Sequence, residues 1–187
     1  MQKIVIFASG TGSNAEKIIL HFKKSSLANV VAVFTNNPHA KVIQRAQNND
    51  VESFTFTKLE LIEGEVLNKL NTIQPDLIVL AGFLLKFPES IIDSYPNKVI
   101  NIHPALLPKY GGKGMYGMHV HNAILENKEK ETGITIHYVN ENYDEGAYIF
   151  QKAVGIENCI TAEDIALEIQ KLEHQYFPEV IENLLSK

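Results

Sequence analysis

The stretch KIVIFASGTGSNAEKI, residues 3 to 18, decides the fold. Its first half is a nearly continuous apolar run, as expected for a strand that is buried on both faces of a parallel sheet. Two glycines and small polar residues then lead the chain into a segment that can start a helix. A buried strand followed by a helix is the repeating unit of an α/β fold.

The same alternation continues along the chain. Three further apolar runs predict buried strands, and the segments between them carry helical spacing or helix-start signals. The strands are predicted at 30–34, 76–82 and 98–102, and the helices at 14–24, 38–49, 60–72 and 88–95. This βαβα order predicts a parallel sheet with right-handed crossovers.

The pattern changes after residue 130. GITIHYVN and AYIFQKAVGI, which begin at residues 133 and 147, predict two more strands joined by the turn-rich NENYDEG. A final helix is expected from Thr161, an N-cap with Asp164 three residues on, continuing past Pro178. No repeat or linker divides the sequence, so residues 1–187 are expected to form one domain.

The composition limits the possible classes of function. A net charge of −5 and a pI near 5.8 argue against a general nucleic-acid surface, which needs clustered Lys and Arg. No run approaches the roughly 20 apolar residues of a membrane span, and no signal-peptide pattern is present. The single cysteine, Cys159, cannot form an internal disulfide, which suits a reducing compartment. We therefore expect a cytoplasmic protein that binds neither nucleic acid nor membranes.

The glycine-rich turn after the first strand predicts a phosphate site. Gly12, Ser13 and Asn14 are the best-placed donors, because backbone N–H groups at the start of a helix attract anions. The second strand ends in TNN and lacks the acid of a dinucleotide site, and no Lys-Ser/Thr pair follows the glycines. Taken alone, the motif is equally compatible with a structural turn.

The segment NIHPALLP, residues 101 to 108, predicts a second cluster of functional groups. Asn101 and His103 end a predicted strand and face the same side, and Pro104 stops the strand after them. Asp144 lies in the turn YDEGA and has a structural alternative as a turn residue. If that turn folds over the end of the sheet, its carboxylate favours a protonated His103, a general acid near neutral pH.

Glu173 shares a helix face with Ile169 and Phe177. An unpaired buried carboxylate is unfavourable. The side chain therefore lies either at the edge of that face in water or in a polar cleft.

The segment YGGKGMYGMH, residues 110 to 119, is too rich in glycine for a packed element and forms either a mobile lid or a long loop. His119 and His121 at its end do not predict a metal site. Helical residues at i and i+2 diverge, and no acid or cysteine completes a ligand set.

Five motifs together resemble those of the glycinamide ribonucleotide formyltransferases, folate-dependent enzymes of purine biosynthesis. They are SGTGSN at 9–14, LAGF at 80–83, NIHPALLPKY at 101–110, YDEGA at 143–147 and LEHQYFP at 172–178. The resemblance covers almost the whole chain. It implies a single-domain, Rossmann-like α/β formyltransferase fold, with a mostly parallel sheet flanked by helices and an antiparallel C-terminal part. It also implies transfer of the formyl group of 10-formyltetrahydrofolate, a co-substrate, to the amine of glycinamide ribonucleotide, without a metal, by a monomer or homodimer.

The resemblance assigns roles to individual residues. Asn101, His103 and Asp144 would be catalytic, with Asp144 raising the pKa of His103. The glycine-rich loop would hold the substrate phosphate and Glu173 the ribose. The folate would lie against Leu84, Leu85, Lys86, Phe87, Asn101, Asn140, Glu141, Asn142 and Tyr143.

Two features depart from the family pattern. Family members commonly carry an arginine soon after LAGF, where this chain has Leu85 followed by Lys86, which affects recognition of the folate glutamate tail. The insertion GGKGMYGM lengthens the link between PKY and HVH, so the loop over the site is expected to be longer and slower to order.

Other classes of function remain alternatives. Formyltetrahydrofolate deformylase has a similar catalytic set but hydrolyses the folate, and it normally carries an extra N-terminal regulatory domain. Methionyl-tRNA formyltransferase shares the N-x-H core but has a different first loop and an RNA-binding domain. A non-catalytic nucleotide-binding protein would need the glycine loop alone.

Overall fold

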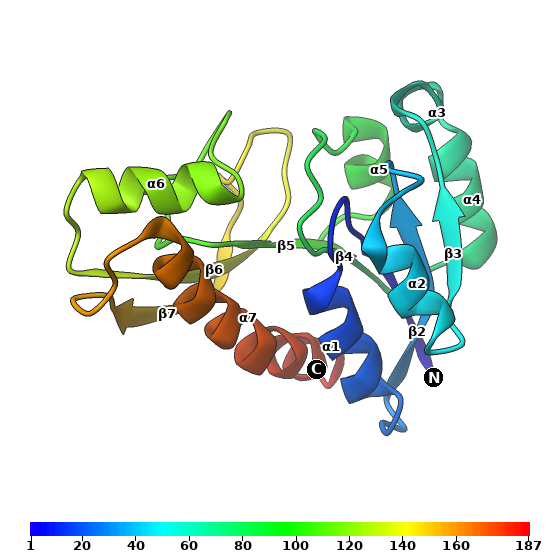
Figure 1. Ribbon diagram of the computed structural model, residues 1–187. Helices are drawn as coiled ribbons and strands as arrows, with labels where there is room; N and C mark the ends of the chain where they lie inside the picture. Colours follow the sequence, from blue (N-terminus) through cyan, green and yellow to red (C-terminus); the bar gives the residue numbers. More distant parts are fainter.

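A seven-stranded sheet runs through the computed structural model, which describes residues 1–187 (Figure 1). Its order is β3-β2-β1-β4-β5-β6-β7. The strands are β1 Gln2–Phe7, β2 Ala28–Thr35, β3 Glu52–Thr55, β4 Leu77–Leu80, β5 Val99–His103, β6 Glu131–Tyr138 and β7 Tyr148–Gly155. In this order, neighbouring strands from β3 to β5 are parallel to each other. The β5–β6 and β6–β7 pairs are antiparallel. The prediction of a mostly parallel sheet with an antiparallel C-terminal part is confirmed.

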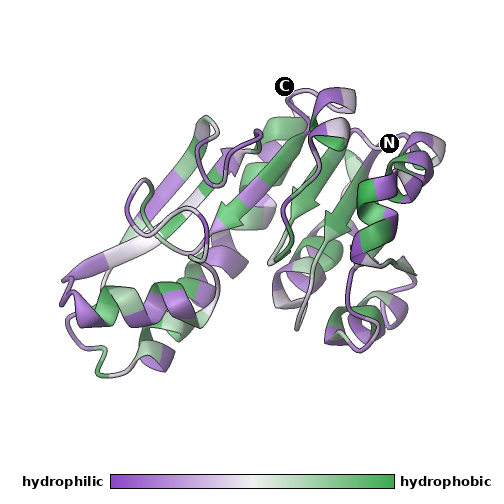
Figure 2. Cartoon of the chain, turned by 90° about the horizontal axis from the view of Figure 1, so that it is seen from above, coloured by the Kyte–Doolittle hydropathy of each residue, from purple (hydrophilic) through white to green (hydrophobic).

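Helices cover both faces of the sheet. They are α1 Ser13–Phe22, α2 Lys41–Gln47, α3 Lys58–Glu63, α4 Glu65–Ile73, α5 Glu89–Ser94, α6 Met118–Glu126 and α7 Ala162–Leu185. Side chains of α1, α2, α6 and α7 form one core, and those of α3, α4 and α5 form the other. Along β1, Ile4 and Ile6 enter the first core while Val5 and Phe7 enter the second, because strand side chains alternate. Figure 2 shows the apolar strands enclosed between these helices.

The sequence patterns missed two elements and merged two others. The short edge strand β3 pairs only with β2, and α6 begins at Met118 directly after the glycine-rich segment. The helix predicted over 60–72 is two helices, α3 and α4, separated at Gly64. Gly64 has φ 95°, in the left-handed region, which ends α3.

The last helix begins as predicted. Thr161 and Asp164 form a capping box, in which each side chain accepts a hydrogen bond from the backbone N–H of the other residue. Pro178 lies inside α7 on its buried side. None of the helices has both the length and the apolar composition needed to cross a bilayer.

Candidate functional site

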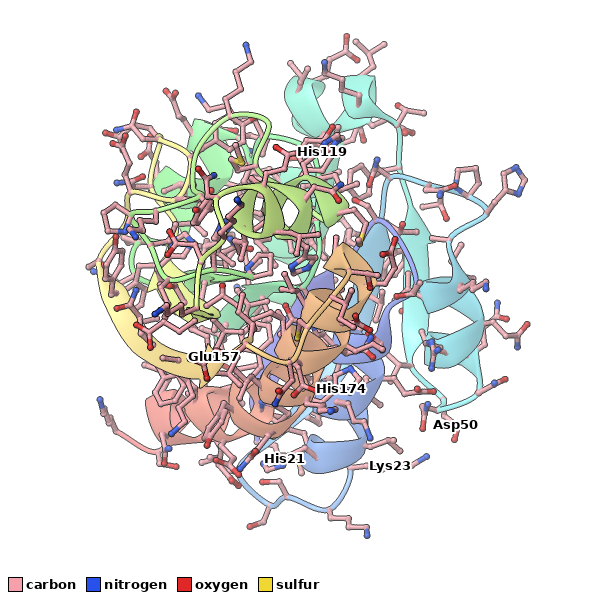
Figure 3. The ribbon with its side chains drawn as sticks, turned by 60° about the vertical axis from the view of Figure 1, so that its left-hand side comes forward. His21, Lys23, Asp50, His119, Glu157 and His174 are labelled. Atoms are coloured by element: carbon pink, nitrogen blue, oxygen red, sulfur yellow. The ribbon has the colours of Figure 1, made fainter.

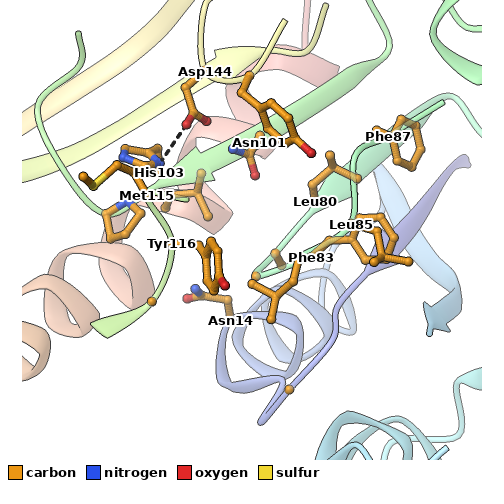
Figure 4. Close-up of a pocket in the computed structure, with 18 of the residues that line it drawn as sticks. Asn14, Leu80, Phe83, Leu85, Phe87, Asn101, His103, Met115, Tyr116 and Asp144 are labelled. Carbon is orange, nitrogen blue, oxygen red and sulfur yellow. Dashed lines mark ion pairs between the residues drawn. The ribbon is translucent and has the colours of Figure 1, made fainter. Parts of the chain in front are cut away.

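A cavity of about 820 Å³ opens where β1, β4 and β5 end. Carboxyl ends of parallel strands are the usual binding edge of an open α/β sheet. Every residue that the sequence predicted for the site lines this one cavity, part of which is shown in Figure 4. They are Gly12, Ser13, Asn14, Leu84, Leu85, Lys86, Phe87, Asn101, His103, Asn140, Glu141, Asn142, Tyr143, Asp144 and Glu173.

The glycine-rich turn delivers the chain into α1 at the edge of the cavity. Gly12 is the N-cap of α1, with φ 72° in the left-handed region, and no side chain caps this helix. A Cβ atom at Gly12 would lie 2.8 Å from Val42 Cα, so the turn packs against α2 too closely for any side chain. The first N–H groups of α1 therefore remain available for an anion.

Glu173 lies in a polar cleft, which decides between the two alternatives for this residue. Asn14 Nδ2 donates a hydrogen bond to Glu173 Oε2 at 2.9 Å and joins the start of α1 to the middle of α7. Part of the Glu173 side chain is open to the cavity, but the surrounding protein excludes most water from its carboxylate. This burial raises the pKa of Glu173, against a smaller lowering by the Asn14 hydrogen bond.

The turn that carries Asp144 folds over the end of β5, as expected. Asp144 Oδ2 lies 3.5 Å from His103 Nδ1 (Figure 4, dashed line) and accepts a hydrogen bond of 2.9 Å from the Gly112 backbone N–H. On the other side of the ring, His103 Nε2 donates to the Tyr110 backbone carbonyl at 2.7 Å. The imidazole is 3% exposed, so these two contacts define its orientation.

The expected rise in the pKa of His103 is not found. Burial lowers this pKa, because an imidazolium loses its hydration, and the Asp144 charge and the Tyr110 carbonyl raise it by less. The pKa of His103 therefore lies below its ordinary value. The predicted upward effect of Asp144 on this pKa has the expected sign, but the desolvation of the buried ring outweighs it.

Sequence reasoning missed His137, a third side chain beside Asp144. It lies on β6 directly opposite Asn101, donates from Nδ1 to its neighbour's carbonyl at Tyr138, and accepts a 3.2 Å hydrogen bond at Nε2 from Asn101 Nδ2. The same Nε2 lies 3.5 Å from Asp144 Oδ1. An imidazole in the otherwise apolar run GITIHYV was the available signal.

Asp144 is held ionised by this cluster. Burial alone would raise its pKa, but the nearby His137 imidazole, the nearby His103 imidazole and the Gly112 N–H together lower it below its ordinary value. A carboxylate with these three neighbours is the electrostatic centre of the site.

An apolar wall faces this polar cluster across the cavity. Leu80, Phe83, Leu85 and Phe87 come from the end of β4 and the segment after it (Figure 4). Next to them, Lys86 Nζ lies 3.5 Å from Glu89 Oε1 in an exposed ion pair. Apolar walls with a few convergent polar groups are typical of cofactor and substrate pockets.

The glycine-rich segment lies beside the site. It has no regular structure before α6, and Gly112, Gly114 and Gly117 have φ values of 92°, 89° and 53°. Its Met115 and Tyr116 line the cavity (Figure 4).

The histidines at the end of this segment diverge as expected. His121 is buried and lines the cavity, whereas His119 is exposed. Figure 3 shows His119, His21 and His174 at separate places on the molecule. No group of three His, Cys, Asp or Glu side chains lies close enough together to hold a metal ion.

Comparison with known proteins gives the family. The model of the formyl transferase family matches residues 2–181. This chain belongs to the formyl transferase family. The matched residues include all seven strands of the sheet.

Individual relatives agree with this assignment. The chain is 37% identical to phosphoribosylglycinamide formyltransferase of Bacillus subtilis, over 99% of this chain and 95% of that protein. It is 36% identical to the chloroplastic phosphoribosylglycinamide formyltransferase of Vigna unguiculata but spans only 61% of that protein's length. The crystal structure of phosphoribosylglycinamide formyltransferase from Bacillus halodurans superposes with a TM-score of 0.89 at 36% identity, covering 100% of this chain and 96% of that one.

Proposed function

We propose that this protein transfers the formyl group of 10-formyltetrahydrofolate to the amine of glycinamide ribonucleotide, giving formylglycinamide ribonucleotide and tetrahydrofolate. One observation carries the proposal. A helix N-terminus suited to phosphate, an Asn-His-Asp cluster suited to acyl transfer and an apolar wall suited to a pterin line the same cavity. The names of the relatives agree with this combination.

The nucleotide would bind between α1 and α7. Its phosphate would accept hydrogen bonds from the backbone N–H groups of Gly12, Ser13 and Asn14, where the helix dipole also favours negative charge. Its ribose hydroxyls would donate to Glu173, which already accepts a hydrogen bond from Asn14. This arrangement supports a dianionic sugar phosphate as the first substrate.

The folate would lie on the opposite side of the cavity. Its apolar ring system would pack against the segment from Leu84 to Phe87, and its ring N–H and carbonyl groups would meet the backbone of residues 140–143. Lys86 would face the carboxylates of the glutamate tail, in an exposed position where Glu89 competes for it. The binding energy on this side would come mainly from the burial of apolar surface.

The polar cluster would serve the chemical step. The glycinamide amine attacks the formyl carbon, and the carbonyl oxygen becomes negative in a tetrahedral intermediate. Asn101 Nδ2 has two hydrogens and gives one to His137, so the other can donate to that oxygen. The negative charge of the intermediate raises the affinity of His103 for a proton at the moment when a cation is needed. His103 can then take the proton that the attacking amine must lose and pass it to the folate nitrogen, as the bond between that nitrogen and the formyl carbon breaks.

Asp144 would support this charge change. Its carboxylate is ionised and lies beside His103, so the imidazolium that forms is paired as soon as it appears. Holding the two substrates side by side would supply much of the remaining acceleration.

The test is a paired assay of the purified protein with 10-formyltetrahydrofolate. Formation of formylglycinamide ribonucleotide is measured with glycinamide ribonucleotide present, and release of formate to water is measured without it. We expect transfer to exceed hydrolysis by at least about two orders of magnitude, the size of one oriented catalytic contribution. Formate release that is unaffected by the nucleotide would instead identify a deformylase, and no consumption of the folate would refute both activities.

A further inference from the structure

His103 and Asp144 both also contact the backbone at the start of the glycine-rich segment. His103 Nε2 contacts the Tyr110 carbonyl at 2.7 Å, and Asp144 Oδ2 accepts from the Gly112 N–H at 2.9 Å. A carbonyl oxygen only accepts, so Nε2 carries a hydrogen in both the neutral and the charged ring. The nitrogen of His103 that gains and loses a proton is therefore Nδ1, which lies 3.5 Å from Asp144.

The carbonyl that fixes this arrangement belongs to an unusual residue. Tyr110 has φ 57°, in the left-handed region that L-residues with large side chains rarely adopt. Such a conformation persists only where the surroundings determine it. Relaxation of Tyr110 toward an ordinary backbone conformation would turn its carbonyl away from His103.

Tyr110 packs against the main core, and its hydroxyl makes a hydrogen bond at the surface. Its hydroxyl donates to Glu129 Oε1 at 2.9 Å, and the same oxygen accepts from Lys109 Nζ at 3.0 Å. These two hydrogen bonds, the one from Lys109 first, lower the pKa of Glu129, so it is ionised at neutral pH. Hydrogen bonds to an ionised acceptor are stronger than neutral ones. Neither Tyr110 nor Glu129 lines the cavity.

We propose that Tyr110 is a positioning residue for His103, and that its hydroxyl bond to Glu129 keeps the carbonyl aimed at Nε2. The ring of His103 is attached to the rigid end of β5, so its remaining freedom is rotation about its side-chain bonds. The Tyr110 carbonyl stops that rotation and leaves Nδ1 facing Asp144 and the cavity. The proposal rests on the proposed function, since it assigns a role in the same reaction.

The first test compares four variants in the formyl transfer assay. Tyr110→Phe and Glu129→Ala both remove the hydroxyl bond, and we expect kcat to fall by about 3- to 30-fold, within the range for small misplacements of a catalytic group. The KM values of both substrates should stay within about twofold, because neither residue lines the cavity. Glu129→Gln should restore most of kcat, since its amide oxygen can still accept from Tyr110. Lys109→Ala is the comparison variant, because it removes the other donor to Glu129 Oε1 and keeps the hydrogen bond from the Tyr110 hydroxyl.

The second test does not depend on activity. NMR of the ring nitrogens of His103 should show the Nε2–H tautomer in the wild type and a mixture of tautomers in Tyr110→Phe. The acid form of His103 should also fade at lower pH in the variant, because the carbonyl contact raises the pKa of this ring. The other charged or titrating groups around the ring, Asp144, His137 and His121, are unchanged by the substitution.

Two results would overturn the proposal. One is a kcat within about twofold of wild type in both Tyr110→Phe and Glu129→Ala, with the tautomer retained. The other is an equal loss in Glu129→Gln and Lys109→Ala, which would indicate surface charge instead of a hydrogen bond. If Tyr110→Phe does not fold, Glu129→Ala and Glu129→Gln are compared instead, by kcat and by the NMR spectra of His103. Absence of formyl transfer in the wild type would refute the proposed function alone, since the tautomer of His103 would still be measurable.

Discussion

At the scale of single residues, Asp144 connects the parts of the site. It reaches His103, His137 and the Gly112 N–H from a backbone with φ 57°, a conformation that Asp tolerates better than most residues. Its charge is the only feature that an Asn at this position would lack. The substitution Asp144→Asn therefore separates the effect of the charge from that of the loop contact, because an amide oxygen still accepts from Gly112.

For Asp144→Asn we expect kcat to fall by roughly 10²- to 10⁴-fold, the range of general acid–base catalysis. The nucleotide KM should change little, because the turn at Gly12 is untouched. The carboxylate raises the pKa of His103, so its loss lowers that pKa further, and activity that needs the acid form should fade at lower pH than in the wild type. An NMR titration of His103 beside the pH–rate profile measures this shift.

The matched control is Glu145→Gln, which removes a negative charge from the exposed neighbouring residue. It should leave both kcat and the His103 titration unchanged. A near-normal kcat in Asp144→Asn with an unmoved His103 pKa would show that Asp144 is only a turn residue.

At the scale of elements, the turn into α1 packs against α2 and also presents the N–H groups that are proposed to bind phosphate. The left-handed backbone at Gly12 and its contact with Val42 leave no space for a side chain. A substitution here must displace the N–H groups that would meet the phosphate. The neighbouring Gly10 has no such limit, since a Cβ there meets nothing within 4 Å.

Gly12→Ala is therefore expected to raise the nucleotide Kd by about tenfold or more, equivalent to the loss of one or two hydrogen bonds to a charged group. Folate binding should be nearly unchanged. Gly10→Ala should keep both affinities within a few-fold of wild type. Isothermal titration of each ligand distinguishes these outcomes, and equal nucleotide affinities in folded Gly12→Ala and wild type would remove the turn from the site.

The elements also show what the sequence could predict. Long apolar runs such as the one in β1 identified the parallel sheet, because burial on both faces leaves a strong pattern. The four-residue β3 has only edge contacts and carries little such pattern. The catalytic candidates were found from local motifs, whereas His137 joins them through its pairing with Asn101, which no local pattern contains. The net pKa of His103 depends on burial, a property of the folded chain.

At the scale of the whole molecule, the Asn14–Glu173 hydrogen bond links the first helix to the last. The buried carboxylate has a raised pKa, so the folded state keeps its proton at a pH where the unfolded chain has lost it. The folded state then binds more protons, and the free energy of unfolding falls as pH rises through this range. A feature retained despite this loss of stability is characteristic of a functional site.

Glu173→Gln should therefore raise the Tm at neutral pH and flatten the fall of stability between mildly acidic and neutral pH. It should also raise the nucleotide KM more than it lowers kcat, because ribose contacts form in the ground state and the transition state alike. Thermal unfolding at several pH values and steady-state kinetics measure the two effects. Glu179→Gln, an exposed position on the same helix, is the control. A Tm gain with unchanged kinetics would show that Glu173 has no contact with substrate.

The position of α7 also determines when the site is assembled as the chain is synthesised. All seven strands precede α7 in chain order, yet α7 packs on α1, α6 and β6 and carries Glu173 (Figure 1). A chain emerging from the ribosome can thus pair its strands while the core face that α7 covers is still open. Such a nascent intermediate would expose apolar side chains of the sheet and offer them to chaperones. The cleft between Asn14 and Glu173 closes only after α7 has emerged, so the proposed affinity for the sugar phosphate would be acquired after the apolar wall beyond β4 has formed.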